Sequence, residues 1–154
     1  MRYKYQMMID SPLGPLTLAG TDDALAKITF GDMREGNEAA SAPLELAARE
    51  LAEYFEGKRR EFTVPLAPEG TAFQRKVWDA LREVPYGETE SYKDIAVRIG
   101  KPGAAIAVGQ ANSRNPIPII IPCHRVIGSD GKLVGYAGGL HIKIALLELE
   151  KRAK

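Results

Sequence analysis

A change of residue pattern near position 68 constrains the fold of this 154-residue chain more than any other feature of the sequence. Before it, short apolar or alternating runs have the length of strands, and after it longer runs have helical spacing. The Pro/Gly-rich stretch APEG stands at the change. We therefore expect an α+β protein with an N-terminal lobe over residues 1–68 and a C-terminal lobe over residues 69–154.

The N-terminal lobe is predicted to hold an antiparallel sheet and one helix. Residues 3–9, 15–19 and 25–30 form the strand-like runs, and the turn compositions SPLG and TDD separate them. The stretch LELAARELAEYFE repeats apolar residues at helical spacing before Gly57, which predicts an amphipathic helix. Residues 61–68 return to a strand-like composition.

Helix start signals dominate the C-terminal lobe. Thr71 with Gln74 predicts a capping box for FQRKVWDALREV, and Ser91 with Asp94 predicts a second one for YKDIAVRIG. A further helix, AAIAVGQANSR, follows the turn KPG. Two helices around a tight turn are typical of a DNA-binding helix-turn-helix, and also of an ordinary helical hairpin in a core, so both interpretations stay open.

The second helix of this pair is made mostly of small residues, Ala104, Ala105, Ala107, Gly109 and Ala111. A helix with so little bulk can bring its backbone close to a nucleic-acid groove and recognise shape without base-specific side chains. The alternative is that small residues only permit close packing against other helices.

Composition excludes several classes of protein. A single cysteine cannot form an internal disulfide, and with only two histidines there is no spaced ligand set for zinc, so we expect no metal. No apolar run is long enough to span a membrane, and no signal peptide begins the chain, so we expect a soluble cytoplasmic protein. The net charge of +1 requires any DNA contact to come from local groups.

Three prolines precede the only cysteine. Pro116, Pro118 and Pro122 are expected to stiffen an extended apolar segment that presents Cys123 and His124 at its end. A thiol becomes a strong nucleophile as the thiolate, which a neighbouring base or cation favours, and the dipeptide HR after the cysteine supplies both. The alternative is that the cysteine is simply a small buried apolar residue.

The last helix offers a carboxylate for the histidine. In GLHIKIALLELEKR, Leu140, Ile144 and Leu147 are predicted to form the buried arc, and Glu150 lies at its edge. A carboxylate there could fix the tautomer of His124, as in a catalytic triad. The alternative is a solvated charge near a helix C-terminus.

The stretch PCHRVIGSDGKLVGYAGG, with NPIPII before it and LLELE after it, resembles the O6-alkylguanine-DNA alkyltransferases. The resemblance covers residues 71–150 and extends more weakly to SPLGPLTLAG and YFEGK. It implies a first lobe with an antiparallel sheet and a helix, and a helical second lobe that holds a helix-turn-helix and the active-site cysteine.

The activity implied by this resemblance is DNA repair. The alkyl group of O6-alkylguanine, and of O4-alkylthymine, would pass irreversibly to the cysteine in a single turnover, without a cofactor. The damaged base would first be flipped out through the minor groove of double-stranded DNA, with little sequence preference. The protein would act as a monomer, with cooperative binding on DNA as the alternative, and without a membrane.

The same resemblance assigns roles to individual residues around the thiol. Cys123 matches the alkyl acceptor, His124 the base that acts through water, and Glu150 its carboxylate partner. Asn115 matches the side chain that braces the active-site segment. The backbone carbonyl of Val126, with that of the cysteine, would face the exocyclic amine of guanine.

Four further positions match residues that contact the flipped nucleotide. Tyr92 matches the tyrosine beside the backbone phosphate, and Tyr136 the tyrosine whose hydroxyl meets the base. Ala137 matches a backbone amide that faces the guanine oxygen, and Pro118 a wall of the alkyl pocket.

The sequence departs from the family in the recognition helix. Ile106 stands where the family commonly has an arginine that fills the gap left by the flipped base, so we expect an apolar wedge without the cationic contribution. Arg98, Lys101 and Arg114 are expected to contact phosphates instead.

The residues are also compatible with two other functions. A cysteine hydrolase needs Cys123, His124 and a carboxylate, but hydrolase partners usually come from distant segments and no oxyanion-hole motif is evident. A binder of alkylated bases without repair activity would not need to retain the cysteine.

Overall fold

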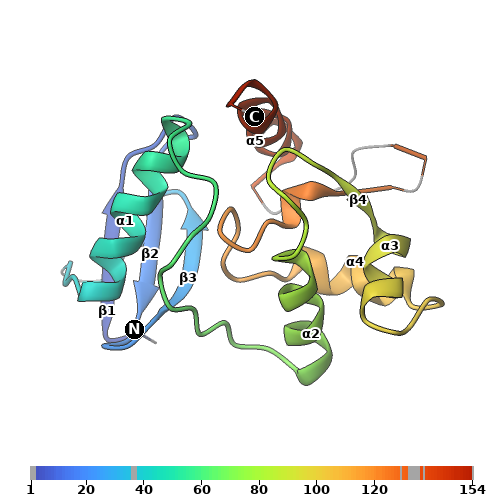
Figure 1. Cartoon of the computed structure of the whole chain (residues 1–154). Helices are drawn as coiled ribbons and strands as arrows, with labels where there is room; N and C mark the ends of the chain where they lie inside the picture. The colour runs from blue at the N-terminus through green and yellow to red at the C-terminus, as the bar shows by residue number, and fades with distance from the viewer. Residues whose placement is uncertain (1–2, 36–37, 129, 132–135, 137, 154) are drawn as a thin grey trace. The chain divides into compact units, whose positions relative to one another are not determined.

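The computed structural model describes the whole chain except residues 1–2, 36–37, 129, 132–135, 137 and 154 (Figure 1). It divides into two compact units, Met1–Glu69 with Ala153, and Gly70–Arg152. The first unit combines a sheet with a helix and the second is mainly helical, so the prediction of an α+β fold is confirmed.

The first unit is built on a three-stranded antiparallel meander. Its strands are β1 (Tyr5–Ile9), β2 (Leu16–Gly20) and β3 (Leu25–Phe30), in the spatial order β1-β2-β3. In the register, Leu18 lies opposite Met7 on one side and Ile28 on the other. The three strand-like runs of the sequence were therefore predicted correctly.

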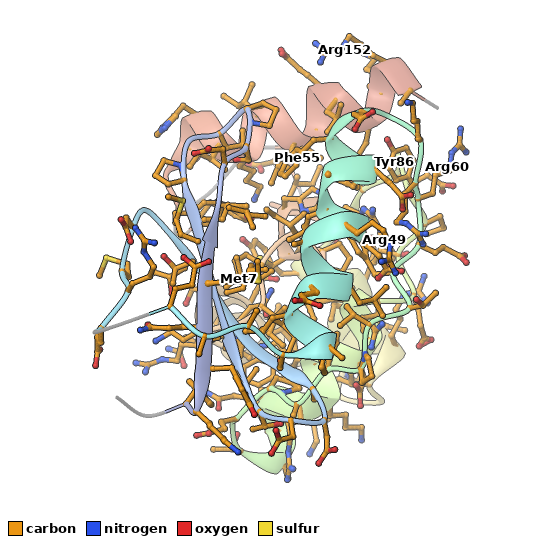
Figure 2. All side chains as sticks on the ribbon, turned by 90° about the vertical axis from the view of Figure 1, so that its left-hand side faces the viewer. Met7, Arg49, Phe55, Arg60, Tyr86 and Arg152 are labelled. Carbon is orange, nitrogen blue, oxygen red and sulfur yellow. The ribbon has the colours of Figure 1, made fainter. Side chains whose placement is uncertain are left out.

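Helix α1 (Ala42–Phe55) contacts all three strands of this sheet. The side chain of Ser41 caps its first turn, because its oxygen accepts a hydrogen bond from a free backbone N–H there. Leu44 and Leu51 are fully buried and belong to the core of this unit, whereas Arg49 lies on the side of α1 away from the strands (Figure 2).

The strand-like expectation for residues 61–68 is wrong. Only one bridge forms, between Leu25 and Leu66, supported by backbone bonds from Leu25 N to Pro65 O and from Ala67 N to Leu25 O. Pro65 and Pro68 have no N–H to donate, so a ladder cannot continue through them.

The second unit carries the remaining elements of the described chain, except for Ala153 at the end of α5. They are α2 (Ala72–Leu81), β4 (Glu90–Ser91), α3 (Tyr92–Arg98), α4 (Ala105–Ser113), the 3-10 helix η1 (Cys123–Arg125), β5 (Val126–Ile127) and α5 (Leu140–Ala153). Both predicted capping boxes are present, at the starts of α2 and α3.

Helices α2, α3 and α4 pack on one another. The indole of Trp78 on α2 is buried and donates from Nε1 to the carbonyl oxygen of Ala111 on α4 at 2.9 Å. Between α3 and α4 the chain turns at Gly100, whose φ of 77° lies in the left-handed region that favours glycine. Strand β4 pairs in parallel with β5, which places Ser91, the residue before α3, opposite Ile127.

Among the described residues, none of the helices is long and apolar enough to cross a membrane.

We predict that Glu50, which lies on α1, stabilises the segment that follows this helix in the first unit. Its buried carboxylate accepts hydrogen bonds from the backbone N–H groups of Thr63 and Val64 and pairs with Arg59. Because Glu50→Ala leaves these donors without an acceptor, it should lower the free energy of unfolding by about 1–3 kcal/mol in urea titrations. The control is Glu53→Ala, which removes a more exposed pair with Arg59 and should change it by less than about 1 kcal/mol. Equal effects of the two substitutions would contradict the prediction.

Candidate active site

The segment that leads to the cysteine is a series of turns, and the expectation of an extended segment is wrong. The side chain of Asn115 bonds to two backbone groups of this segment. Its Nδ2 donates to the carbonyl oxygen of Ile121 at 2.8 Å, and its Oδ1 accepts from the N–H of Ile117 at 3.0 Å. A backbone bond from Ile121 N to Ile117 O, of 3.0 Å, closes the same loop. The chain then enters η1, which begins at Cys123.

Ile119 lies inside this loop with a φ of 75°. A β-branched residue in the left-handed region is strained by about 1–3 kcal/mol and persists only where surrounding contacts hold it. Here the Asn115 hydrogen bonds and the burial of Ile119 itself supply those contacts. The loop is thus a rigid support for the cysteine, consistent with the bracing role expected for Asn115.

Glu150 on α5 is the centre of a buried polar network. Its Oε2 lies 2.6 Å from Nε2 of His124, and Arg125 donates to both carboxylate oxygens, at 2.8 Å and 3.0 Å. The backbone N–H of Gly87 donates to Oε1 at 3.1 Å, and a third nitrogen of Arg125 donates to the carbonyl oxygen of Val84 at 2.8 Å. Glu150 and His124 are fully buried, so the alternative of a solvated charge is excluded.

This arrangement fixes the protonation of the network. Burial alone would raise the pKa of Glu150, but the hydrogen bond with His124 and the paired Arg125 hold it well below its usual range. Burial lowers the pKa of His124, and the adjacent carboxylate does not offset that effect. An ionised Glu150 requires His124 to carry its proton on Nε2, which leaves Nδ1 as a hydrogen-bond acceptor. Nδ1 is buried and has no hydrogen-bond partner within the described residues.

The buried face of α5 differs from the predicted arc. Ile142, Lys143, Leu146 and Glu150 are buried, whereas Leu140 and Ile144 are exposed. The hydrogen-bonding needs of the polar members decide the rotation of the helix, because an unpaired charge is far more costly to bury than an apolar residue is to expose.

Cys123 is buried, with 4% of its surface exposed, so the expected presentation of its thiol at the surface is wrong. Burial raises the pKa of the thiol. Hydrogen bonds with the side chains of Asn115 and Tyr136 and the charge of Lys143 act in the opposite direction. The thiol is therefore protonated at rest, yet it is surrounded by groups that stabilise a thiolate.

Two tyrosines expected at the base lie near the thiol. Tyr136 is partly buried, and its side chain acts to lower the pKa of the Cys123 thiol. Tyr92, at the start of α3, is also partly buried; burial and then the nearby thiol raise its pKa. Pro118 is buried in the loop before the cysteine. Ala137 lies outside the described residues.

The two carbonyl groups expected to face guanine both have donors from flanking helices. Nδ2 of Asn112 on α4 lies 3.4 Å from the carbonyl oxygen of Cys123. Nζ of Lys143 on α5 donates to the carbonyl oxygen of Val126 at 2.7 Å. The Val126 oxygen has a second lone pair that can still accept a hydrogen bond, whereas the Cys123 oxygen also accepts from the N–H of Val126.

Helix α4 uses its small residues in two ways. Ala111 is buried and receives the indole of Trp78, and a Cβ on Gly109 would only touch the ring of Tyr92, so part of the helix serves close packing. On its other side Ile106 is 82% exposed and Arg114 is exposed at the C-terminal end. An exposed isoleucine next to small residues leaves the expected wedge accessible.

One predicted phosphate contact has another partner. Arg98 makes a bidentate hydrogen-bonded ion pair with Glu90 of β4. Lys101 and Arg114 are exposed, so their side chains are accessible for the predicted phosphate contacts.

Sequence reasoning missed the roles of two buried cations. The sequence predicts Arg125 to be a cation for the thiol, but its guanidinium binds Glu150 and the carbonyl oxygen of Val84. Lys143 shares the buried face of α5 with Ile142 and Leu146, and a lysine beside these apolar positions was a usable signal. Within the described ranges, no group of three His, Cys, Asp or Glu side chains could hold a metal ion.

The chain matches two family profiles that together span most of its length. The first is described as 6-O-methylguanine DNA methyltransferase, ribonuclease-like domain, and matches residues 1–68. The second is described as 6-O-methylguanine DNA methyltransferase, DNA binding domain, and matches residues 72–152. The resemblance identified from the PCHRV stretch is thereby confirmed.

Individual proteins are similar over nearly the whole chain. The methylated-DNA–protein-cysteine methyltransferase of Methanosarcina barkeri is 56% identical over 96% of this chain and 97% of its own. The protein of the same name from Methanosarcina acetivorans is 51% identical over 95% of this chain and 97% of its own. A crystal structure of Mycobacterium tuberculosis OGT in complex with DNA has a TM-score of 0.89 and 51% identity, covering 97% of this chain and 94% of that one.

We predict that the Glu150 network stabilises the second unit. Because Glu150→Ala leaves the buried guanidinium of Arg125 uncompensated, the free energy of unfolding should fall by about 3–5 kcal/mol, measured in urea. The matched control is Glu148→Ala, an exposed carboxylate on the same helix, which should be nearly neutral. A small effect at position 150 would mean that the network relaxes without cost.

We also predict that the resting thiol is poorly nucleophilic. Because burial raises the pKa of Cys123, iodoacetamide should alkylate the native protein at pH 7 at least about tenfold more slowly than glutathione, and faster as the pH rises. Intact-mass spectrometry is unambiguous, since the chain has one cysteine. Unfolding in urea should abolish the difference. Native alkylation as fast as that of glutathione would show a preformed, accessible thiolate.

Proposed function

Because the chain belongs to the 6-O-methylguanine DNA methyltransferase family, we propose that it repairs DNA by transferring the alkyl group of O6-alkylguanine to Cys123. It is an enzyme of the methylated-DNA–protein-cysteine methyltransferase type. The observation that carries the assignment of the acceptor is the buried contact between Glu150 and Nε2 of His124, beside the only cysteine of the chain.

The chemistry follows from the protonation of this contact. Neutral His124 accepts the thiol proton at Nδ1, directly or through water, and the imidazolium is stabilised by ionised Glu150. The thiolate sulfur then forms a bond to the alkyl carbon while the bond from that carbon to guanine O6 breaks. The electron pair stays with the guanine.

Guanine needs one proton to leave in its normal form. The hydroxyl of Tyr136, whose side chain influences the pKa of the thiol, is suited to donate to the purine, and the proton held by His124 restores the balance. Overall, the thiol proton moves to the base and the alkyl group moves to the sulfur. No metal or cofactor enters the balance.

The reaction ends after one event. A thioether has no acidic proton and is a poor leaving group, and the chain has no second cysteine to attack it. Each protein molecule therefore repairs one lesion and is consumed. This distinguishes the proposal from a cysteine hydrolase, whose acylated or alkylated cysteine is regenerated by water.

We further propose how DNA is bound. Burial of Cys123 supports a substrate base that has been flipped out of the duplex, with exposed Ile106 on α4 inserted as an apolar wedge. Tyr92 would lie beside the backbone phosphate of the flipped nucleotide. Pro118 would form part of the wall of the alkyl pocket, and the amide of Ala137 would lie near the guanine oxygen. The similar OGT crystallised with DNA supports DNA as the partner.

The remaining features of the proposal concern specificity and setting. O4-alkylthymine carries the same alkyl–oxygen bond and is proposed as a second substrate. Arg114 and the backbone contact phosphates without reading sequence, and α3 with α4 acts as the helix-turn-helix. The protein acts as a monomer in the cytoplasm, with cooperative binding as the alternative outcome of a titration on long duplexes.

The decisive measurement is the mass of the protein after incubation with a duplex that contains one O6-methylguanine. We expect a stoichiometric gain of one methyl group on the Cys123 peptide, and none in Cys123→Ser. Tyr136→Phe should slow transfer by about 10- to 100-fold, because the leaving guanine loses a donor. Steady release of product beyond one equivalent would favour the hydrolase. Tight binding of the damaged duplex without any mass gain would favour the non-catalytic binder.

A further inference from the structure

The side chain of Asn112 is buried beside the cysteine, and the proposed chemistry gives it no role. The residue lies in the last turn of α4 and is 4% exposed. Its Nδ2 faces the carbonyl oxygen of Cys123 at 3.4 Å. Its Oδ1 is buried and has no hydrogen-bond partner among the described residues. Because a buried acceptor without a donor is destabilising, this atom is a candidate to bind a donor from outside the chain.

The orientation of this amide is determined by its neighbour. A carbonyl oxygen only accepts hydrogen bonds, so the amide nitrogen must face Cys123, and Oδ1 points away from that oxygen. The backbone around Asn112 is also held. The N–H of Asn115 donates to the carbonyl oxygen of Asn112 at 3.3 Å, and the indole of Trp78 donates to that of Ala111 at 2.9 Å. Oδ1 is therefore a fixed acceptor at the end of α4, next to the residue that carries the thiol.

The carbonyl oxygen of Cys123 has no lone pair left for a base. A backbone carbonyl oxygen has two lone pairs, and this one already accepts from the N–H of Val126 and from Nδ2 of Asn112. The family resemblance implies that this carbonyl faces the exocyclic amine of guanine. In the structure, the acceptor that remains open beside it is Oδ1 of the amide that occupies it.

Alkylation leaves guanine in DNA with one group that can donate a hydrogen bond. O6 carries the alkyl group, so N1 has lost its proton, and N9 is bound to the sugar. N1, N3 and N7 only accept hydrogen bonds, whereas the exocyclic 2-amino group donates them. A buried acceptor that faces a flipped O6-alkylguanine can therefore bind the base only through its 2-amino group.

We propose that Asn112 is a specificity-determining residue, whose Oδ1 accepts a hydrogen bond from the 2-amino group of the flipped O6-alkylguanine. The inference rests on the proposed function for the presence of the flipped base. The nitrogen of the amide holds the backbone of Cys123 while its oxygen holds the base, so one side chain aligns the two reactants.

This role makes alkylated bases without a 2-amino group poorer substrates. O6-methylhypoxanthine differs from O6-methylguanine only in lacking that group, so it would leave Oδ1 of Asn112 buried without a donor. O4-methylthymine has a carbonyl oxygen at the corresponding position, which would place an acceptor against an acceptor. Both bases should therefore react more slowly than O6-methylguanine.

The test compares two duplexes that differ by one amino group, with O6-methylguanine or O6-methylhypoxanthine opposite the same base. Methyl transfer is followed by intact mass, and the ratio of the two rate constants measures the preference for the amino group. Asn112→Leu replaces the amide by an apolar side chain of similar shape, and Asn112→Ala removes it. Gln110→Ala, which removes an exposed amide of the same helix, is the matched control. Circular dichroism and urea unfolding establish that each variant is folded.

We expect the unsubstituted protein to prefer O6-methylguanine, and this preference to fall about tenfold in both Asn112 variants. Differences in base-pair opening and in the leaving base are common to all variants, so they cancel when the ratios are compared. A role limited to holding the backbone of Cys123 would slow both substrates equally and leave the ratio unchanged. Gln110→Ala should keep the ratio of the unsubstituted protein.

An unchanged ratio in the folded Asn112 variants would overturn the inference. Equal rates with the two duplexes in the unsubstituted protein would also overturn it, whether or not the variants fold. If the unsubstituted protein accepts no methyl group from either duplex, the proposed function fails. The affinities of the two duplexes for Cys123→Ser, with and without Asn112→Ala, would then decide the role of Asn112 by the same ratio.

Discussion

The ionised carboxylate of Glu150, buried between His124 and Arg125, is the interaction on which the site depends. It joins three parts of the second unit: the turn after α2 at Gly87, the 3-10 helix η1 and the C-terminal helix α5. Arg125 ensures that the carboxylate stays charged despite burial, because a guanidinium does not lose its proton in proteins. The charge then dictates which nitrogen of His124 carries the proton. One ion pair thereby determines both the packing of α5 and the acceptor state of the histidine.

The geometry of the cysteine follows from a second set of constraints. The loop before it contains a strained isoleucine, Ile119, and the amide of Asn115 bonds two backbone groups inside the loop to hold it. After the cysteine, the Val126 carbonyl is held by Lys143 and its N–H by the carbonyl of Cys123 itself. The thiol therefore projects from backbone that is fixed on both sides. Rigid support of this kind is what a reaction with strict alignment requires.

Local sequence signals predicted the elements of this chain well. The capping pairs Thr71/Gln74 and Ser91/Asp94 placed two helices, because a cap depends only on residues within one turn. The strands of the meander were also predicted from local signals, which are the short apolar or alternating runs and the turn compositions between them. Predictions failed where distant partners decide: the Pro-rich loop needs the amide of Asn115, and the rotation of α5 depends on Arg125 and His124. The burial of Lys143 likewise depends on a carbonyl that helical periodicity does not reveal.

The burial of Cys123 and the exposure of Ile106 are complementary in the proposed complex. The proposed reaction requires the base to leave the stack, because the thiol lies beneath the surface of the protein. The vacated space must be filled, and an exposed isoleucine on a helix of small residues fits that space without a charge. Arg98 is bound to Glu90, so fewer cations remain to neutralise phosphates. The affinity of this protein for DNA would then depend more on shape and apolar contact, and less on counterion release, than that of a protein with an arginine at the position of Ile106.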